Sequence, residues 1–283
     1  MKKVLSVLLC FAMLFSILSV TAFAAEETTR YVVIGDSIAY GLGLSNAGEA
    51  DYGKIVADTN GYSYENYAIP GHTTGNLIDR MKNDTVKKAI QNADIISVSI
   101  GGNNFLLGNL GALLYEGIVK DDYSRFDDIA ESFYEDLCTI VTTIQSLNPD
   151  AVILLQTVYN PQTGYIGEAY EQGLLRLNAK ISEYAQENPE NILVVDVAQY
   201  LTDSENDFAE DRIHPSAAGN EKIAQAVLQT LYDNGLGSET VPVINTKGED
   251  AHGTVTFAAS MNLYGRLLHM LSLVRGLFKV LFG

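Results

Sequence analysis

Two short segments, far apart in the sequence, carry the residues needed for nucleophilic catalysis. Ser37 follows an apolar run in Gly35-Asp36-Ser37, and Asp211 stands three residues before His214 in Asp211-Arg212-Ile213-His214-Pro215. A serine hydroxyl is a weak nucleophile until an imidazole accepts its proton, and a carboxylate beside the imidazole fixes the reactive tautomer. We therefore interpret Ser37 as a candidate nucleophile, His214 as its general base and Asp211 as the partner that orients His214.

Two further segments offer groups for an oxyanion hole. Gly71 follows an apolar stretch and can present an unshielded backbone N–H, and Asn103, in Gly101-Gly102-Asn103-Asn104, can present a side-chain amide. Such donors stabilise the charge that develops on a carbonyl oxygen during acyl transfer. Each segment is ordinary by itself, since serine caps helices and glycine and asparagine are common in turns.

The elements that must position these residues alternate between short β-branched runs and longer amphipathic stretches. This alternation predicts a parallel sheet covered by helices on both faces, with the site at the carboxyl ends of the strands. The predicted strands are residues 30–34, 62–67, 95–100, 151–156 and 192–195. The predicted helices are residues 52–60, 77–91, 124–147, 168–187 and 217–232.

Taken in order, the four segments resemble the sequence blocks of the SGNH (GDSL-like) hydrolases. The resemblance spans residues 30–232 and implies a flavodoxin-like three-layer α/β/α fold with a parallel sheet of about five strands. It implies that Ser37 is the nucleophile and that His214 and Asp211 are its acid-base partners. It also implies an oxyanion hole made by the backbone N–H groups of Ser37 and Gly71 and the side chain of Asn103. The third block often reads Gly-x-Asn-Asp, and this chain departs from it at Asn104.

The two ends of the chain differ in character from the α/β region. Residues 1–24 combine Lys2 and Lys3, an apolar stretch and Ala22-Phe23-Ala24, which predicts a signal peptide cleaved after Ala24 and a secreted protein. The hydrolase domain is then expected over residues 25–237, a linker over 238–253 and a basic amphipathic tail over 254–283.

Composition excludes several classes of function. The chain has 18 basic and 35 acidic residues, a formal charge of −17, so nucleic acid is not an expected partner. The four histidines have no metal-ligand spacing, and we expect no metal or other cofactor. The chain also lacks the Gly-x-Ser-x-Gly elbow of the ordinary α/β-hydrolases. Cys138 is the single cysteine beyond the leader and is expected to be a small core residue.

The first functional hypothesis is an extracellular esterase that acts on an acyl ester or a lysophospholipid-type lipid. The apolar stretch Phe105–Tyr115 suits a hydrocarbon chain, although it fits a core helix equally well. The alternative is a carbohydrate O-deacetylase, because Tyr40, Tyr67, Tyr159 and Tyr165 could stack on sugar rings. A third hypothesis is a surface-binding protein that has no catalytic activity, which Asn104 and the C-terminal tail suggest.

The tail from Asn262 to Phe282 is amphipathic. Polar or small residues recur in steps of three and four on one helical stripe, and the remaining residues form a wide apolar face. With Arg266, Arg275 and Lys279, the segment is too charged to span a bilayer comfortably. We expect it to lie on a membrane surface, with docking on its own domain or on another protein as the alternatives.

Overall fold

The computed structural model describes residues 28–107, 109–252 and 256–282. In the last helix, the side chains of residues 256–263, 278, 281 and 282 are not described. The predicted signal peptide lies outside these ranges.

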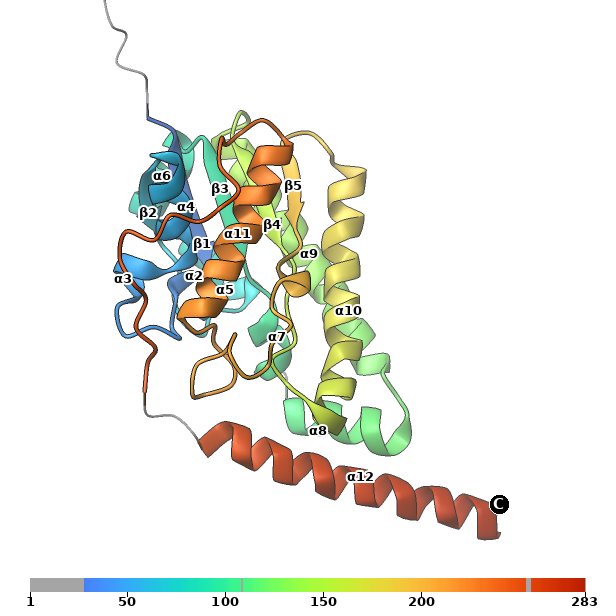
Figure 1. Ribbon diagram of the computed structural model, residues 1–283. Coiled ribbons are helices and arrows are strands. Elements are labelled where there is room, and N and C mark those ends of the chain that lie inside the picture. The colour runs from blue at the N-terminus through green and yellow to red at the C-terminus, as the bar shows by residue number, and fades with distance from the viewer. Residues whose placement is uncertain (1–27, 108, 253–255, 283) are drawn as a thin grey trace, which may run out of the picture.

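Five parallel strands form the central sheet (Figure 1). Their order is β2-β1-β3-β4-β5, which is the flavodoxin-like order and confirms the predicted fold class. The chain changes direction of winding between β1 and β3, so the carboxyl ends of these two strands flank the switch point where open α/β sheets place their sites. The strands are β1 (Arg30–Gly35), β2 (Ser63–Asn66), β3 (Ile95–Ser99), β4 (Val152–Gln156) and β5 (Ile192–Val195).

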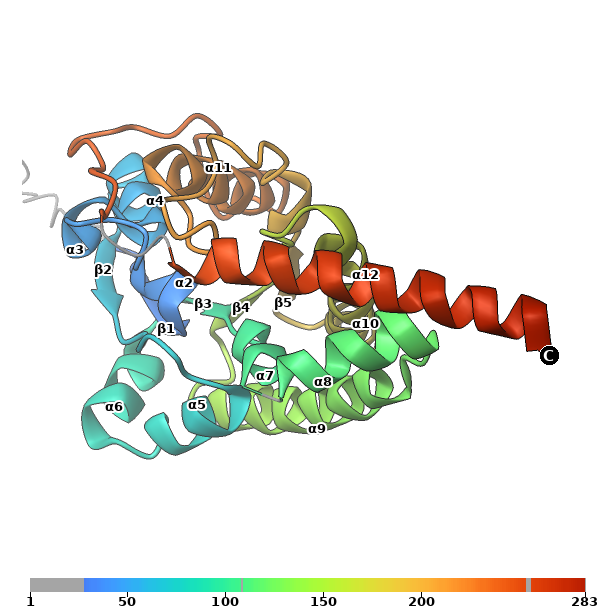
Figure 2. The same cartoon turned by 90° about the horizontal axis from the view of Figure 1, so that it is seen from below.

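Helices cover both faces of the sheet, and the strands alternate their side chains between two cores. Val32 and Ile34 of β1 pack toward α5, α6, α9 and α10, whereas Tyr31 and Val33 pack toward α4 and α11. Seen from below, these two groups of helices lie on opposite sides of the strands (Figure 2). These helices are α4 (Tyr52–Asn60), α5 (Thr74–Arg80), α6 (Asp84–Asn92), α9 (Ser124–Leu147), α10 (Gly164–Glu187) and α11 (Ala217–Asp233).

Shorter helices gather at the carboxyl ends of the strands. They are α2 (Ser37–Tyr40), α3 (Ala47–Ala50), α7 (Gly102–Leu106), α8 (Leu110–Tyr115), the π-helical turn η1 (Glu116–Lys120) and the 3-10 turn η2 (Val197–Gln199). The last helix, α12 (Thr256–Phe282), crosses this end of the molecule (Figures 1 and 2).

The single helix predicted for residues 77–91 is wrong. The chain forms α5 and α6 in its place, separated by a turn at Asn83. Asn83 has extended backbone angles, and its side chain accepts hydrogen bonds from the N–H groups of Thr85 and Val86, at 2.9 and 3.4 Å. An asparagine that caps a helix ends the preceding one, because its own backbone leaves the helical region.

The segment predicted as a linker follows the surface of the α/β body. Ala251 donates its N–H to the carbonyl of Gly43 at 2.8 Å, and Asn46 donates to the carbonyl of Lys247 at 3.0 Å. Asp250 accepts from the N–H of Ala217 at 2.7 Å, at the start of α11. These bonds bring the chain back to the carboxyl end of the sheet, where α12 begins its course.

Candidate active site

Ser37 is the first residue of α2, immediately beyond β1. The turn before it depends on Gly35, which has φ +148°, and a Cβ atom there would lie 2.0 Å from the carbonyl oxygen of Ser99 in β3. The N–H of Asp36 donates to that same carbonyl at 3.1 Å. The carboxylate of Asp36 then caps α2 by accepting from the N–H of Ile38 at 2.9 Å. The close approach of β1 to β3 and the cap together fix the position of Ser37.

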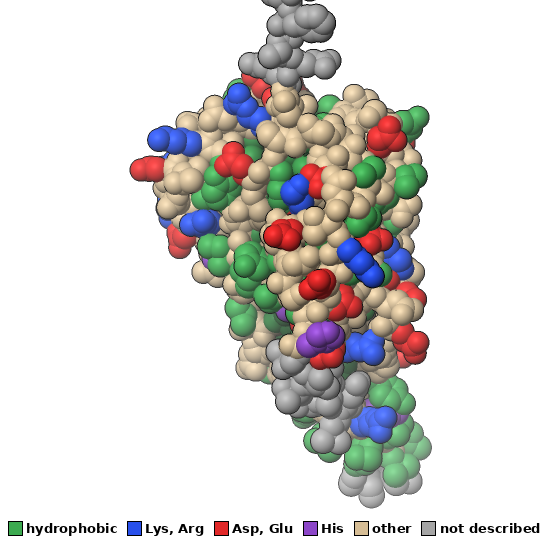
Figure 3. Space-filling model, turned by 60° about the vertical axis from the view of Figure 1, so that its left-hand side comes forward, with side chains coloured by type: hydrophobic (Ala, Val, Ile, Leu, Met, Phe, Trp, Pro, Cys, Tyr) green, Lys and Arg blue, Asp and Glu red, His purple; other side chains and the backbone are tan. Residues whose placement is uncertain are grey.

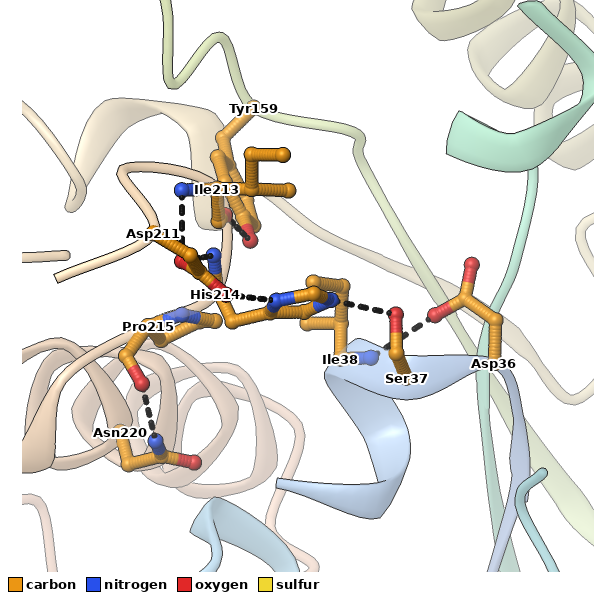
Figure 4. Close-up of polar contacts among 9 residues, drawn as sticks. All are labelled: Asp36, Ser37, Ile38, Tyr159, Asp211, Ile213, His214, Pro215 and Asn220. Carbon is orange, nitrogen blue, oxygen red and sulfur yellow. Dashed lines mark hydrogen bonds and ion pairs between the residues drawn. The ribbon is translucent and has the colours of Figure 1, made fainter. Parts of the chain in front are cut away.

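The turn before α11 holds Asp211 and His214 side by side. One carboxylate oxygen of Asp211 accepts from the N–H groups of Ile213 and His214, at 2.9 and 3.0 Å. Arg212, which follows Asp211, has φ +57°, a left-handed conformation that tightens the turn. From the loop after β4, the Tyr159 hydroxyl donates to the carbonyl of Ile213 at 2.8 Å (Figure 4).

The three candidate catalytic side chains form one hydrogen-bonded series (Figure 4). Ser37 Oγ lies 2.9 Å from His214 Nε2, and His214 Nδ1 lies 2.5 Å from Asp211 Oδ2. With its proton on Nδ1, the imidazole donates to Asp211 and leaves Nε2 to accept the proton of Ser37. This arrangement can activate a serine hydroxyl for attack on a carbonyl carbon.

Two carboxyl groups near the histidine have opposite pKa shifts. Partial burial raises the pKa of Asp211, but the hydrogen bonds from the His214 ring and from the two backbone N–H groups outweigh it, and the pKa falls below its ordinary value. Burial raises the pKa of Asp36 to about 7, although Ile38 and His214 act in the other direction. Asp211 therefore remains charged at neutral pH, whereas Asp36 is partly protonated there.

The oxyanion candidates line the same cavity as Ser37 and His214. Gly71 has φ +81° and presents open backbone, since a Cβ atom placed there would meet no other described residue within 4 Å. Asn103 donates one side-chain N–H to the carbonyl of His72 at 2.9 Å, which fixes the amide. An amide nitrogen has two N–H groups, so the second can serve an oxyanion. His72 thus contributes its backbone carbonyl, a role that its sequence position did not indicate.

Asn104, where the third block departs from its usual sequence, fastens this loop to two helices. Its side-chain oxygen accepts from the N–H of Thr74 at 3.2 Å, and its nitrogen donates to the Thr74 hydroxyl at 2.8 Å. That hydroxyl donates in turn to the carboxylate of Asp136 in α9. Asn104 does not line the cavity, so the departure changes the support of the loop and leaves the reacting groups in place.

The cavity beside Ser37 has a volume of about 280 Å³ and mostly apolar walls. Besides the predicted site residues, it is lined by side chains that include Leu106, Val158, Pro161, Tyr170, Val197 and Ile213. A smaller apolar pocket shares four of these residues and adds Leu110 and Ile166. The stretch Phe105–Tyr115 divides between the pockets and the core, because Leu106 and Leu110 line these spaces while Phe105, Leu113 and Leu114 are buried in the core.

The four tyrosines singled out from the sequence separate in the structure. Tyr159 lies in the cavity wall, whereas Tyr40, Tyr67 and Tyr165 do not line it. Tyr165 stacks on His269 of α12, with ring centroids 3.6 Å apart. Tyr170, which the sequence analysis missed, takes a place in the wall from the second turn of α10; nothing in its local sequence distinguishes it from other core tyrosines. Cys138 lies on α9 and is half-buried, packed against the core.

A flavodoxin-like sheet with a serine, histidine and aspartate in contact at its switch point is an arrangement that can support hydrolysis through a serine nucleophile. Residues 33–222 match the GDSL-like Lipase/Acylhydrolase family, and the chain belongs to that family. The resemblance drawn from the four sequence blocks is thereby confirmed.

The chain is similar to one curated protein in sequence and to solved structures in fold. The uncharacterized protein YpmR of Bacillus subtilis (strain 168) is 26% identical over 75% of this chain and 86% of its own length. The lipase Lip_vut3 from a goat rumen metagenome has a TM-score of 0.60 and 18% identity, covering 72% of this chain and 98% of the lipase. A Clostridium thermocellum family 3 carbohydrate esterase has a TM-score of 0.53 and 19% identity, covering 75% and 100%.

Proposed function

We propose that this protein is a serine ester hydrolase that works through an acyl-enzyme on Ser37. The observation that carries the proposal is the hydrogen-bonded series from Ser37 through His214 to Asp211, placed at the wall of a cavity. In the first half-reaction, Ser37 Oγ attacks the ester carbonyl carbon while His214 Nε2 takes its proton. The N–H groups of Ser37, Gly71 and Asn103 stabilise the resulting oxyanion.

Collapse of the tetrahedral intermediate breaks the bond to the leaving alcohol, which takes the proton from His214. In the second half-reaction, a water molecule gives its proton to His214 and attacks the acyl carbon. The acid is released, and the proton returns to Ser37 Oγ. Throughout, Asp211 keeps the proton-bearing Nδ1 of His214 turned toward itself and stabilises the imidazolium.

We propose a substrate with a hydrocarbon acyl chain, such as an acyl ester or a lysophospholipid. The cavity walls include the aliphatic side chains of Leu106, Val158 and Ile213, and a smaller pocket that shares Leu106 and Ile213 adds Leu110 and Ile166. Apolar walls of this kind favour burial of methylene groups, each contributing about 0.8 kcal/mol. The likeness in fold to a lipase agrees with this choice, and the likeness to a carbohydrate esterase makes acetylated carbohydrate the alternative substrate.

A panel of esters tests the reaction and the substrate together. We expect kcat/KM on p-nitrophenyl esters to rise from acetate toward medium-chain acyl groups, with lysophospholipid hydrolysed and acetylated xylan a poor substrate. The exposed Ser63→Ala variant is the matched control for Ser37→Ala and should keep full activity. Hydrolysis confined to acetylated xylan would make the protein a deacetylase, and absence of turnover on every ester would favour a binding protein.

Secretion is proposed from the sequence of residues 1–24. The charged start, apolar stretch and Ala-x-Ala site form the pattern of a cleaved leader. N-terminal sequencing of the protein recovered from the medium of an expressing culture should begin at Ala25. Retention of residues 1–24 in a membrane fraction would contradict cleavage.

A further inference from the structure

The helix α12 is held to the α/β body by a narrow stripe that contains one buried leucine beside small and polar residues. Gly265, Leu268, Ser272 and Arg275 recur in steps of three and four and form the stripe nearest the body. Leu268 is only 2% exposed. A Cβ atom at Gly265 would lie 2.6 Å from the side chain of Ile166 in α10, so glycine permits this close approach.

Polar contacts complete the attachment. The Tyr264 hydroxyl donates to the carbonyl of Gly111 in α8 at 2.9 Å, and the Arg275 guanidinium donates to the carbonyl of Val119 in η1. The His269 ring stacks on Tyr165. Docking on the protein's own domain, one of the three sequence-based alternatives, is therefore part of the structure.

The opposite side of α12 is apolar and uncovered. Met270, Leu273, Leu277 and Val280 also recur in steps of three and four, and they are 57%, 61%, 58% and 83% exposed. Leu267, Leu271 and Val274 extend this surface, which we call the outer face of α12. A helix that only docks on its own domain buries its apolar stripe, and a large exposed apolar patch marks an interaction site. In Figure 3, hydrophobic side chains gather around a basic side chain on the described part of α12, and charged side chains of both signs scatter over the body.

The outer face lies at the active-site end of the molecule. α12 crosses the end of the sheet from which α2 and α7 begin, and these helices carry Ser37 and Asn103 (Figures 1 and 2). Leu42, which lines the cavity, and Leu107, next to the lining residue Leu106, are exposed there as well. A surface that contacts the outer face would therefore also face the end of the molecule that holds the cavity.

The charges on α12 favour an anionic lipid surface over a second copy of the chain as the partner of the outer face. The chain has no acidic residue after Asp250. Arg266 is exposed on the outer face, one turn before Met270, and Lys279 is exposed on the other side of α12, one turn after Arg275. A second copy of α12 would bring the same cations with no carboxylates on the helix to pair with them, whereas anionic headgroups would neutralise them. Within the described part of the chain, no helix is long and apolar enough to cross a membrane.

We propose that the outer face of α12 lies in the interface of an anionic lipid surface and holds the active-site end of the protein against it. The helix axis runs parallel to the surface, with Met270, Leu273, Leu277 and Val280 among the acyl chains and the cations at headgroup level. This proposal concerns binding and does not require turnover on Ser37.

Co-sedimentation with vesicles tests the proposal. The protein used is the chain from Ala25 to Gly283 with Ser37→Ala. Binding is then measured without hydrolysis, so the result does not depend on the proposed reaction. We expect binding to phosphatidylglycerol-phosphatidylcholine vesicles that weakens with salt, and much weaker binding to phosphatidylcholine alone. Leu273→Ser with Leu277→Ser should weaken binding by on the order of tenfold or more. Arg266→Gln with Lys279→Gln should remove the preference for the anionic vesicles.

The matched control changes two exposed apolar residues outside α12. Val241→Ser with Val243→Ser should leave vesicle binding unchanged, since Val243 lies beside Thr59 near the end of α4. Thermal unfolding checks that each variant is folded, and Met270→Ser provides a second variant if the double change unfolds. Failure to bind either vesicle, or equal binding by the outer-face variants, would overturn the proposal. A dimer in light scattering that Leu273→Ser with Leu277→Ser dissolves would overturn it in favour of a second copy.

Discussion

The two sides of the candidate active site are organised differently. On the nucleophile side, Ser37, His214 and Asp211 contact one another directly through two hydrogen bonds. On the oxyanion side, Asn103 contacts the carbonyl of His72, and Gly71 presents open backbone to the cavity. The first side is complete in itself, whereas the second keeps donors available for an atom that arrives with the substrate.

This difference follows from what each side must do. Proton transfer requires partners already in contact, because a base must be within hydrogen-bond reach of the proton it takes. Stabilisation of an oxyanion requires preorganised donors without a ground-state partner, because only interactions gained in the transition state accelerate the reaction. The nucleophile side should therefore respond to mutation as one unit, and the oxyanion side as separate, smaller contributions.

The largest expected effect is on the nucleophile side. Ser37→Ala and His214→Ala should each lower kcat by on the order of a thousandfold or more, and the double variant should be no worse than either alone, because the groups act together. Steady-state hydrolysis of a p-nitrophenyl ester measures all three variants. Independent, multiplying losses in the double variant would contradict the idea of one unit.

Asp36, next to the nucleophile, should make stability depend on pH. Burial raises its pKa to about 7, so its contribution to stability is fully present below its unfolded pKa, near 4, and is lost as pH rises toward 7. Asp36→Asn keeps a side-chain oxygen to cap α2 and should remove up to about 4 kcal/mol of this loss. Chemical denaturation of the wild type and of Asp36→Asn at pH 4 and pH 7.5 gives, for each protein, the slope of the free energy of unfolding against pH. The raised pKa of Asp51 affects both proteins equally, so its effect cancels when the two slopes are compared. Equal slopes would show that Asp36 is not the group responsible.

On the oxyanion side, Asn103→Ala should lower kcat by roughly a hundredfold, as loss of one oxyanion donor does, with little change in KM. The same ester assay gives both constants. An effect confined to KM would reassign Asn103 to substrate binding and would remove the proposed difference between the two sides.

The smallest effect is expected at Asn104, which supports the oxyanion side from behind. Asn104→Asp replaces a donor to the Thr74 hydroxyl by a second acceptor, while the proton of that hydroxyl already goes to Asp136. We expect a loss of about 1–2 kcal/mol in the free energy of unfolding, with kcat within a few-fold of wild type.

Adding Asp136→Asn supplies the missing donor and should restore most of that stability, which a double-mutant cycle by denaturation would measure. Simple additivity of the two changes would mean that the Thr74 hydroxyl does not connect them.

The fold could be predicted from the sequence because its signal is local. Each strand is a short β-branched run and each long helix an amphipathic stretch, so the five strands and their parallel arrangement followed from the order of elements. The turn at Asn83 was missed because the apolar spacing continues across it from Leu77 to Val86 and Ile90. The cap at Asn83 divides the stretch into α5 and α6 through local bonds from the N–H groups of Thr85 and Val86, and such a cap competes with the apolar spacing that favours one helix.

The candidate site could be predicted because its residues stand in a recognisable order near element ends. Ser37, Gly71 and Asn103 follow strands, and His214 precedes α11. The structure brings these four to the wall of one cavity, with Asp211 bound to His214.

Their supporting contacts had no sequence signal, because they join groups from distant elements. The Tyr159 hydroxyl on the carbonyl of Ile213 and the Thr74 hydroxyl between Asn104 and Asp136 are examples. The sequence also could not predict which side of α12 packs on the α/β body, because an amphipathic pattern does not specify which stripe makes that contact.

Covalent labelling of the nucleophile tests the central claim most directly. A p-nitrophenyl phosphonate ester mimics the tetrahedral intermediate and should transfer one phosphonyl group per chain, with release of one p-nitrophenol. Intact-mass measurement and peptide mapping should place the group on Ser37, and Ser37→Ala should take up none. Labelling at another residue, together with ester hydrolysis retained by Ser37→Ala, would contradict the account.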